Sequence, residues 1–316
     1  MVKRIMQARV LADRKGLTRE KWLEIRKQGI GGSDAGAICG LNPFSTPFTV
    51  YGEKLGILPP KEETEAMRIG NDLEEYIAKR FTEKTGKKVK NCNYVLQHAK
   101  HDFILGDVDR LVVGENAGLE CKSTNAFNKT NFEKADIPTH WYTQCVHYMA
   151  VTGAERWYLA VLVLGVGFYD FVIERNEEEI KALEDIESEF WNNNVLQCIE
   201  PSPDGREPTT EVIKSLYTAN QGESVDLLPY RELLAKYCEL GAKIKDLEQE
   251  QELIKQEIQI YMANATDGYA EGYKVTWREQ ERKTLDTKRL AQDYPDLYNA
   301  YLKVGKSRPF KATRSE

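Results

Sequence analysis

Residues 101–127 read HDFILGDVDRLVVGENAGLECKSTNAF. Two short apolar runs flank a polar turn that contains two glycines, a pattern typical of a β-hairpin. We expect Asp109 to lie opposite Lys122, and Leu111 to lie opposite Glu120. Side chains alternate between faces along a strand, and directly opposite residues share a face. This register would therefore bring Asp109, Glu120 and Lys122 to one side of the sheet.

These charges have two interpretations. In a solvated hairpin, an ion pair between Asp109 and Lys122 would contribute less than about 1 kcal/mol. On a buried face, each charge costs several kcal/mol unless it is paired or binds a metal. The second interpretation is a divalent-metal site with Asp109, Glu120 and the main-chain carbonyl of Cys121 as oxygen ligands. Lys122 would then hold the attacking water. Oxygen-rich sites of this kind suit magnesium or manganese. A part for Asp107 stays open.

The size and composition indicate a globular protein without a membrane span. The chain has 316 residues, enough for one large domain or one domain plus an appendage. No apolar run approaches the roughly 20 residues that a membrane span needs, and the N-terminus lacks the apolar core of a secretory signal. The six scattered cysteines form no C-x-x-C pair. This favours free thiols in a reducing cytoplasm and argues against an iron–sulfur cluster. Cys92, His98 and His101 are conceivable zinc ligands, but a fourth ligand is missing.

The formal net charge is −6, whereas proteins that bind DNA over a broad surface are usually basic. Any contact with DNA must therefore be local. Residues 1–27 contain nine lysines and arginines against three acids, and the tail from residue 303 is also basic. Solvated ends are the alternative explanation for both segments.

A glycine-rich turn precedes a short helix near the N-terminus. Thr18 is a suitable N-cap for a helix to about Lys27, and the sequence GIGGSD follows from residue 29. Ser33 or Asp34 can cap the next helix. A glycine-rich entry to a helix is a natural phosphate seat, to which Arg26 would add a guanidinium. An ordinary turn is the alternative.

Two further helices carry polar residues beside their apolar stripes. Residues 67–85 have apolar side chains at helical spacing, and Glu74 lies near the edge of that stripe, where it is either solvated or directed inward. After Pro138, Gln144 and Tyr148 share a helix face with Trp141. Other elements are expected at residues 49–55 (helix), 57–66 (connection), 88–97 (strand), 125–137 (loop or lid), 156–173 (hairpin) and 176–191 (helix).

Composition divides the chain into a core at residues 1–200, a linker at 201–229 and a C-terminal region at 230–316. The C-terminal region begins with a long helix over 230–262, in which apolar residues alternate in steps of four and three. This stripe can pair with another chain or be covered by its own. A small β unit over 269–277 and a closing helix over 286–301 follow.

Several motifs occur in a characteristic order. They are W-x-x-x-R followed by GIGGSDAGAICG (22–40), G-x-x-x-E (70–74), V-D-R-L-V (108–112), L-E-C-K (119–122) and HYMAVTG (147–153). With this set the chain resembles the YqaJ-type viral recombinases, relatives of phage lambda exonuclease in the PD-(D/E)XK nuclease superfamily. The resemblance extends over nearly the whole chain, including the C-terminal region.

The resemblance implies an α/β (α+β) fold, with a restriction-endonuclease-like core in which helices flank a mixed central sheet. It implies that Asp109 and Glu120 bind the metal and that Lys122 orients the water or helps to deprotonate it. Glu74 would support the metal site, and Gln144 would orient the lysine or the water. The matched positions Arg26 and Ser33 would hold a 5′-terminal phosphate.

The chain departs from the family pattern at three positions. Val108 and Arg110 stand where relatives usually have proline and glycine around the aspartate. Trp141 stands where relatives often have tyrosine, so no proton-transfer role is assigned to it.

The activity implied is that of a magnesium-dependent exonuclease (manganese is possible) with one or two ions. It would degrade one strand of double-stranded DNA 5′→3′ from its ends, leaving 3′ overhangs for phage-type recombination by strand annealing. The resemblance also implies a RecT-like single-strand annealing protein as partner, a homo-oligomer, and a phage or prophage origin with action in the bacterial cytoplasm. The alternatives are an endonuclease with the same active site and a non-catalytic DNA-binding or assembly module.

Overall fold

The computed structural model describes residues 4–59, 64–217, 222–303, 305 and 307–314. It divides into two compact units, Met1–Thr218 and Ala219–Glu316, and each is described by itself. Parts of the predicted connection at 57–66, of the predicted linker at 201–229 and of the two basic ends lie outside the described residues.

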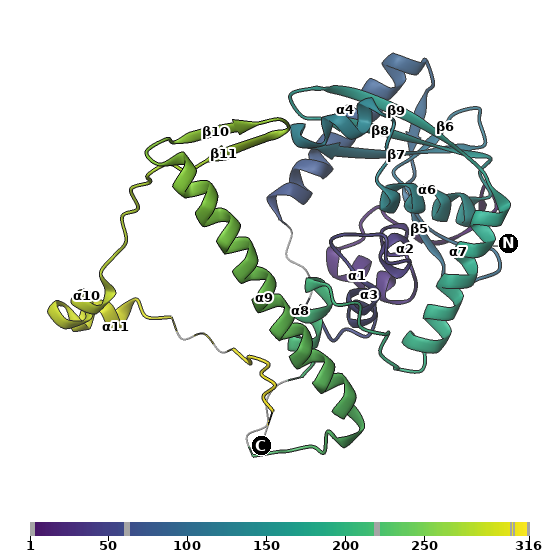
Figure 1. Cartoon of the computed structure of the whole chain (residues 1–316). Coiled ribbons are helices and arrows are strands. Elements are labelled where there is room, and N and C mark those ends of the chain that lie inside the picture. Colours follow the sequence, from purple (N-terminus) through teal and green to yellow (C-terminus); the bar gives the residue numbers. More distant parts are fainter. Residues whose placement is uncertain (1–3, 60–63, 218–221, 304, 306, 315–316) are drawn as a thin grey trace. The chain divides into compact units, whose positions relative to one another are not determined.

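A mixed five-stranded sheet forms the centre of the first unit, as expected (Figure 1). Its strands follow the order β3 (Val89–Asn91), β6 (Arg110–Val112), β7 (Ala117–Thr124), β8 (Arg156–Val163) and β9 (Gly167–Glu174). The pair β7–β8 is parallel, and the other neighbours are antiparallel. The hairpin predicted over 156–173 is the β8–β9 pair.

A second sheet has the strand order β1 (Arg4–Ile5), β2 (Ala8–Asp13), β4 (Tyr94–Gln97) and β5 (Leu105–Asp107). The single strand predicted at 88–97 is therefore wrong, because β3 and β4 belong to different sheets. The first half of the charged stretch divides in the same way between β5 and β6. At this crossing, Val108 is fully buried, and an aspartate lies on either side of it.

The register of the β6–β7 hairpin also differs from the expectation. Leu111 pairs with Gly118 rather than with Glu120, and Arg110 pairs with Leu119. The turn lies one residue earlier than expected and contains Gly114 in the left-handed region, at φ 85°. The pairing is thus shifted by two residues. Because the side-chain period of a strand is two, this shift leaves each side chain on its expected face.

Helix α4 (Glu65–Thr85) covers one face of the five-stranded sheet. Thr64 caps its first turn, and Gly86 ends it in the left-handed conformation. Its residues Ile77 and Phe81 pack against Leu119 and neighbouring side chains of β7 and β8. The predicted stripe is therefore confirmed only in its second half, because Ile69 and Tyr76, which were also expected on it, are 41% and 45% exposed.

Helix α6 (Thr139–Thr152) covers the opposite face (Figure 1). Its apolar residues share a core with β7 and β8 and also with strands of the second sheet. Helix α2 (Gly32–Ile38) crosses α6 closely at Gly36, where a Cβ atom would lie 2.9 Å from the Cβ of His140. Almost all of α6 is buried, so each polar side chain on it needs a partner.

The remaining elements of the first unit complete its shell. They are α1 (Arg19–Lys27), α3 (Pro47–Lys54), η1 (Ala126–Asn128), α5 (Lys129–Glu133), α7 (Glu177–Glu189), η2 (Phe190–Val195) and α8 (Glu207–Leu216). The predicted loop at 125–137 therefore contains two short helices. The predicted linker contains α8, which packs on α3 and donates from Thr209 Oγ1 to Thr46 Oγ1 at 2.9 Å. The first compact unit thus continues past residue 200.

The second unit contains the predicted long helix. Its elements are η3 (Leu228–Tyr230), α9 (Arg231–Met262), the hairpin β10 (Asp267–Ala270) and β11 (Tyr273–Thr276), α10 (Thr287–Asp293) and α11 (Pro295–Ala300). The closing helix expected over 286–301 is two helices, because Pro295 disfavours a helical residue before it. Across the described parts of both units, no helix has the length and apolar character required to cross a bilayer.

Gly118 of β7 lies against the ring of Trp157, and a Cβ atom there would approach that ring to 2.2 Å. We predict that Gly118→Ala lowers the free energy of unfolding by about 1–3 kcal/mol, since Trp157 is fully buried and has no room to move. Urea denaturation measures the change. The matched control is Gly70→Ala in α4, where the new methyl group meets nothing within 4 Å. Equal stability of the two variants would contradict the packing described.

Candidate active site

Glu120 is the most deeply buried member of the charged cluster, with 2% of its surface exposed. Its Oε1 accepts a hydrogen bond from Gln144 Nε2 at 2.8 Å and forms an ion pair with Lys122 Nζ at 2.7 Å. Its Oε2 is buried and has no hydrogen-bond partner within the described part of the chain. Burial raises the pKa of the Glu120 carboxyl, and the Lys122 ammonium only partly offsets this effect. One oxygen of Glu120 is therefore satisfied, and the other is left without a donor.

Asp109 immediately precedes β6, and extending the antiparallel register of β6 and β7 by one residue brings it opposite Glu120. Its Oδ2 accepts a hydrogen bond from the Cys121 amide at 2.9 Å. Burial raises the pKa of Asp109 well above its ordinary value, and the charges of Glu120 and Glu74 raise it further. The repulsion raises this pKa because the two carboxylates face the same small region. A cation there would relieve it.

Lys122 is the positive charge nearest to this pair. Burial alone would lower the pKa of its ammonium, but the Glu120 carboxylate outweighs burial, and the pKa lies above its ordinary value. The predicted convergence of Asp109, Glu120 and Lys122 is thus present in the structure. This convergence persists despite the difference in register, because a shift of two residues leaves each side chain on the same face of the sheet.

The donor set fits a hard divalent cation. Two carboxylates converge, and Glu120 Oε2 has a vacant lone pair. Nowhere in the described ranges do three or more His, Cys, Asp or Glu side chains form a metal-binding group. Magnesium sites commonly use one or two carboxylates together with water and substrate phosphate. Two protein carboxylates are therefore enough, and the Cys121 carbonyl as a further ligand stays a prediction.

Gln144 and Tyr148 connect this site to the end of β5. Gln144 Nε2 also donates to Tyr148 Oη at 3.0 Å, and Tyr148 Oη donates to the main-chain oxygen of Asp107 at 2.9 Å. Gln144 therefore orients Glu120, whereas the predicted role was to orient Lys122 or water. The function of Tyr148 was missed from the sequence. Its position one turn after Gln144 was the signal that could have revealed it.

Glu74 approaches the site from α4 but binds Arg110. The Arg110 guanidinium contacts the carboxylates of Glu74 and Glu75, at 3.0 Å from the latter. Arg110 faces α4 because it pairs with Leu119, which lies on that face. The charge of Glu74 still raises the pKa of Asp109. Glu74 therefore forms an ion pair with Arg110, the residue that departs from the family pattern. Its predicted support of the metal site stays a prediction.

Arg26 and Ser33 lie together in a separate pocket. Arg26 NH2 donates to Ser33 Oγ at 3.0 Å and to Asp34 Oδ1 at 2.9 Å. The Asp34 carboxylate raises the pKa of Arg26. Lys54 Nζ donates to Asp34 Oδ2 at 2.6 Å. Asp34 thus forms ion pairs with both Arg26 and Lys54. These contacts fix the Arg26 guanidinium in place, while 31% of the Arg26 side chain stays exposed.

The pocket borders the carboxylate site through residues at the end of β5. Trp22 Nε1 donates to Asp107 Oδ2 at 2.9 Å, and the Arg26 guanidinium lies 5.0 Å from the centre of the Trp22 ring. Arg14 NH1 forms an ion pair with Asp107 Oδ1 at 2.8 Å. Asp107 therefore faces the pocket. The pocket is lined by Trp22, Arg26, Gly31, Gly32, Ser33, Asp107 and Tyr148, among others.

Tyr148 separates the pocket from the carboxylates. A Cβ atom on Gly32 would lie 2.6 Å from its ring, so glycine is required where the turn meets this side chain. The phosphate seat expected from the glycine-rich turn and the metal site expected from the hairpin therefore lie on two sides of one tyrosine.

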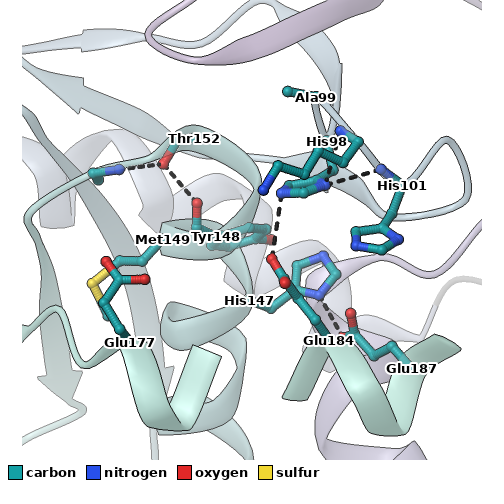
Figure 2. Close-up of polar contacts among 12 residues, drawn as sticks. His98, Ala99, His101, His147, Tyr148, Met149, Thr152, Glu177, Glu184 and Glu187 are labelled. Carbon is teal, nitrogen blue, oxygen red and sulfur yellow. Dashed lines mark hydrogen bonds and ion pairs between the residues drawn. The ribbon is translucent and has the colours of Figure 1, made fainter. Parts of the chain in front are cut away.

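A buried histidine on α6, His147, contacts Glu187 of α7 (Figure 2) and the main chain of β5. His147 Nε2 lies 2.8 Å from the main-chain oxygen of Leu105, and Nδ1 lies 2.7 Å from Glu187 Oε1 on α7. Both ring nitrogens face oxygen acceptors, which favours the doubly protonated ring. Burial alone would lower the pKa of His147, but the Glu187 carboxylate outweighs burial, and the pKa is raised. The crossing that carries Asp107 and Asp109 is anchored in this way.

The zinc alternative finds no support around His98. Its Nδ1 accepts from the amides of Lys100 and His101 at 3.3 and 3.1 Å, and its Nε2 lies 3.4 Å from Glu184 (Figure 2). Both ring nitrogens are therefore engaged within the protein. Cys92 donates its thiol to the main-chain oxygen of Tyr94.

We predict a pH-dependent stability difference between the wild type and Glu187→Gln. The raised pKa of His147 stabilises the fold fully below its unfolded value of about 6.5, and this contribution is lost as the pH rises through the folded value. The excess stability of the wild type should therefore be largest near pH 6 and shrink towards pH 9 in urea denaturation. The control is Glu184→Gln, which changes the partner of His98. Burial lowers the pKa of His98 to about 4, so this histidine stays neutral between pH 6 and 9 and the effect of the control should not vary with pH. A constant difference across this range would contradict the buried ion pair.

Comparison with known proteins places this chain in a family. The model of the YqaJ-like viral recombinase domain matches residues 21–155. The Bacillus subtilis (strain 168) protein described as uncharacterized protein YqaJ is 37% identical over 310 residues, which cover 96% of each chain. Similar solved structures include an alkaline exonuclease (LHK-Exo) from Laribacter hongkongensis, with 19% identity, 57% of this chain and 94% of that chain covered, and a TM-score of 0.48. Another is a phage related exonuclease from Haemophilus somnus 129PT, with 14% identity, 54% of this chain and 96% of that chain covered, and a TM-score of 0.42.

Because the relative from Bacillus subtilis matches along nearly its whole length, the chain belongs to the YqaJ-like viral recombinase family.

Proposed function

We propose that the protein is a divalent-metal-dependent deoxyribonuclease. It degrades one strand of linear duplex DNA in the 5′→3′ direction and leaves a 3′ single-strand overhang. The metal is magnesium, with manganese as a substitute, and Asp109 and Glu120 hold it. The observation that carries the proposal is the unpartnered buried oxygen Glu120 Oε2 beside Asp109 and Lys122. The membership in a family of viral recombinase domains supports it.

The residues of the chain have separable tasks. When bound, the metal ion lowers the pKa of water and neutralises charge on the scissile phosphate. Lys122 adds a positive charge where negative charge develops, in a site that excludes most solvent. Gln144 holds the Glu120 carboxylate by one oxygen and leaves the other free. Tyr148 fixes Gln144 relative to the end of β5.

Arg26 and Ser33 account for the preference for an end. A guanidinium held by Asp34 is already in position, so binding a terminal phosphate costs little side-chain entropy. Because the pocket is separated from the carboxylates by Tyr148, an anchored 5′ phosphate would place a nearby phosphodiester at the site by positioning alone. Contacts to the backbone carry little sequence information, so the enzyme would act on any sequence.

The product suggests the partner. A duplex with a 3′ overhang presents single-stranded DNA to a RecT-like annealing protein, and recombination would then proceed by strand annealing. Such a pair of proteins would act in the cytoplasm of a bacterial host.

We predict that the purified protein with magnesium releases mononucleotides from linear duplex DNA and leaves covalently closed circles intact. Lys122→Ala should reduce cleavage by at least about 100-fold while DNA binding is retained, because the lysine acts on the developing charge rather than on affinity. The readouts are acid-soluble nucleotides and gel-shift affinity. Lys181→Ala, which removes an exposed lysine paired with Asp185 on α7, is the matched control.

Two results would contradict this proposal. A folded protein that leaves linear duplex DNA uncut with magnesium or manganese would not be this nuclease. Cleavage of closed circles at a rate similar to that of linear DNA would indicate an endonuclease with the same site.

We further predict that Arg26→Ala reduces the preference for 5′-phosphate over 5′-hydroxyl ends on the order of ten-fold, since a charged hydrogen-bond donor is lost. The fold should survive, because Lys54 still pairs with Asp34. End-labelled duplexes with the two kinds of end give the ratio directly. Lys27→Ala changes the next residue along α1, a partly exposed lysine paired with Glu24, and should leave the ratio unchanged. An unchanged ratio in Arg26→Ala would place the phosphate seat elsewhere.

A further inference from the structure

Within the described part of the second unit, helix α9 carries an apolar stripe that is left uncovered. Its 32 residues span about 48 Å. Along one side, apolar residues recur in alternating steps of three and four, as in a coiled coil. Ile244 is 56% exposed and Leu247 is 63% exposed. A helix of this kind normally gains most of its stability by packing its apolar side.

The positions on the stripe suit a two-stranded coiled coil. The a positions are Tyr237, Ile244, Gln251 and Ile258. A β-branched residue at a combined with leucine at d favours two strands. Gln251 is the one polar residue among the a positions, and a polar residue there sets the register at a cost in stability.

The d positions are Leu233, Leu240, Leu247, Ile254 and Tyr261. Three of these are leucine, the residue that favours two strands at d. Together with the a positions they extend over about four heptads, which is enough to sustain a coiled coil.

The described remainder of the second unit leaves most of this stripe uncovered. Helices α10 and α11 have 7 and 6 residues. Phe310 packs edge-on against Tyr237 at one end of α9, with 5.4 Å between the ring centres. Beyond that contact, from Leu240 to Ile258, the apolar stripe residues stay between 41% and 63% exposed.

The charges beside the stripe are complementary between two copies of the helix. In a parallel pair, the g position Lys243 meets Glu248 of the other copy, and Glu250 meets Lys255. Both pairs are of opposite sign.

In an antiparallel pair, g meets g and e meets e. In the alignment that pairs Ile244 with Leu247 of the other copy, Lys243 faces Glu250 and Lys236 faces Glu257. These pairs are also of opposite sign. The helix is therefore self-complementary in charge as well as in its apolar positions. We propose that the stripe on α9 binds the α9 helix of a second copy of this chain, so that the protein forms a dimer through a two-stranded coiled coil.

The test measures the mass of the full-length protein in solution by sedimentation at several concentrations and low ionic strength. The wild type should be a dimer, and Ile244→Lys should be a monomer with unchanged helix content by circular dichroism. Lys243→Glu should raise the dissociation constant roughly ten-fold, since it turns two attractive pairs into repulsive ones. The matched control is Lys245→Glu, the same charge change at an outer position, which should leave the mass unchanged.

A second change should restore the dimer weakened by Lys243→Glu. Adding Glu248→Lys restores opposite charges in a parallel pair, whereas adding Glu250→Lys restores them in an antiparallel pair. One double variant should recover the wild-type constant, and the other should not recover it. Because Lys243 also pairs with Glu239 on its own helix, the rescue rather than the single change identifies the contact.

Three results would overturn the proposal. A wild-type monomer at all concentrations would mean that the chain's own first unit or another protein covers the stripe. A dimer that survives Ile244→Lys would use a different surface. Failure of both double variants to recover the constant would exclude a coiled coil in this register.

Discussion

The burial of Glu120 is the constraint on which the rest of the site depends. A carboxylate at the centre of a sheet costs several kcal/mol unless positive charge and hydrogen bonds compensate it. Lys122 and Gln144 satisfy only one of its oxygens, and Asp109 adds a second carboxylate where repulsion raises its pKa. The two carboxylates therefore disfavour each other's charged form in a largely buried position. This arrangement costs stability in the free protein, and a bound cation would offset that cost.

The crossing of the chain between its two sheets places this charge next to the pocket. Asp107 ends β5 in one sheet, and Asp109 precedes β6 in the other. Val108 between them is buried in the core and fixes the chain where it passes from one sheet to the other. Because the chain passes from one sheet to the other between them, Asp107 reaches the pocket around Arg26 while Asp109 reaches the carboxylate site. One short segment thus sets the spacing between the two sites, which explains why a buried histidine anchors the strand that leads into it.

Local signals predicted much of the fold. Thr18 caps α1 as expected, and the helix predicted over 67–85 ends at Gly86, because caps and stops depend on a few neighbouring residues. The faces of the hairpin were predicted because alternation has a fixed period, whereas its register was not, since that depends on where the turn closes. The division of 88–97 between two sheets and the contact of Gly32 with Tyr148 were missed as well. Both depend on residues far apart in the sequence, for which no local pattern exists.

The central claim is that Asp109 and Glu120 hold the same cation. Crystals of the protein soaked in manganese, measured at the manganese absorption edge, test it most directly, because anomalous scattering locates the ion without assumptions about activity. The account predicts one strong peak within bonding distance of Asp109 and of Glu120 Oε2, and its loss in Asp109→Asn. A well-ordered site without a peak, or a peak bound by other residues alone, would contradict it.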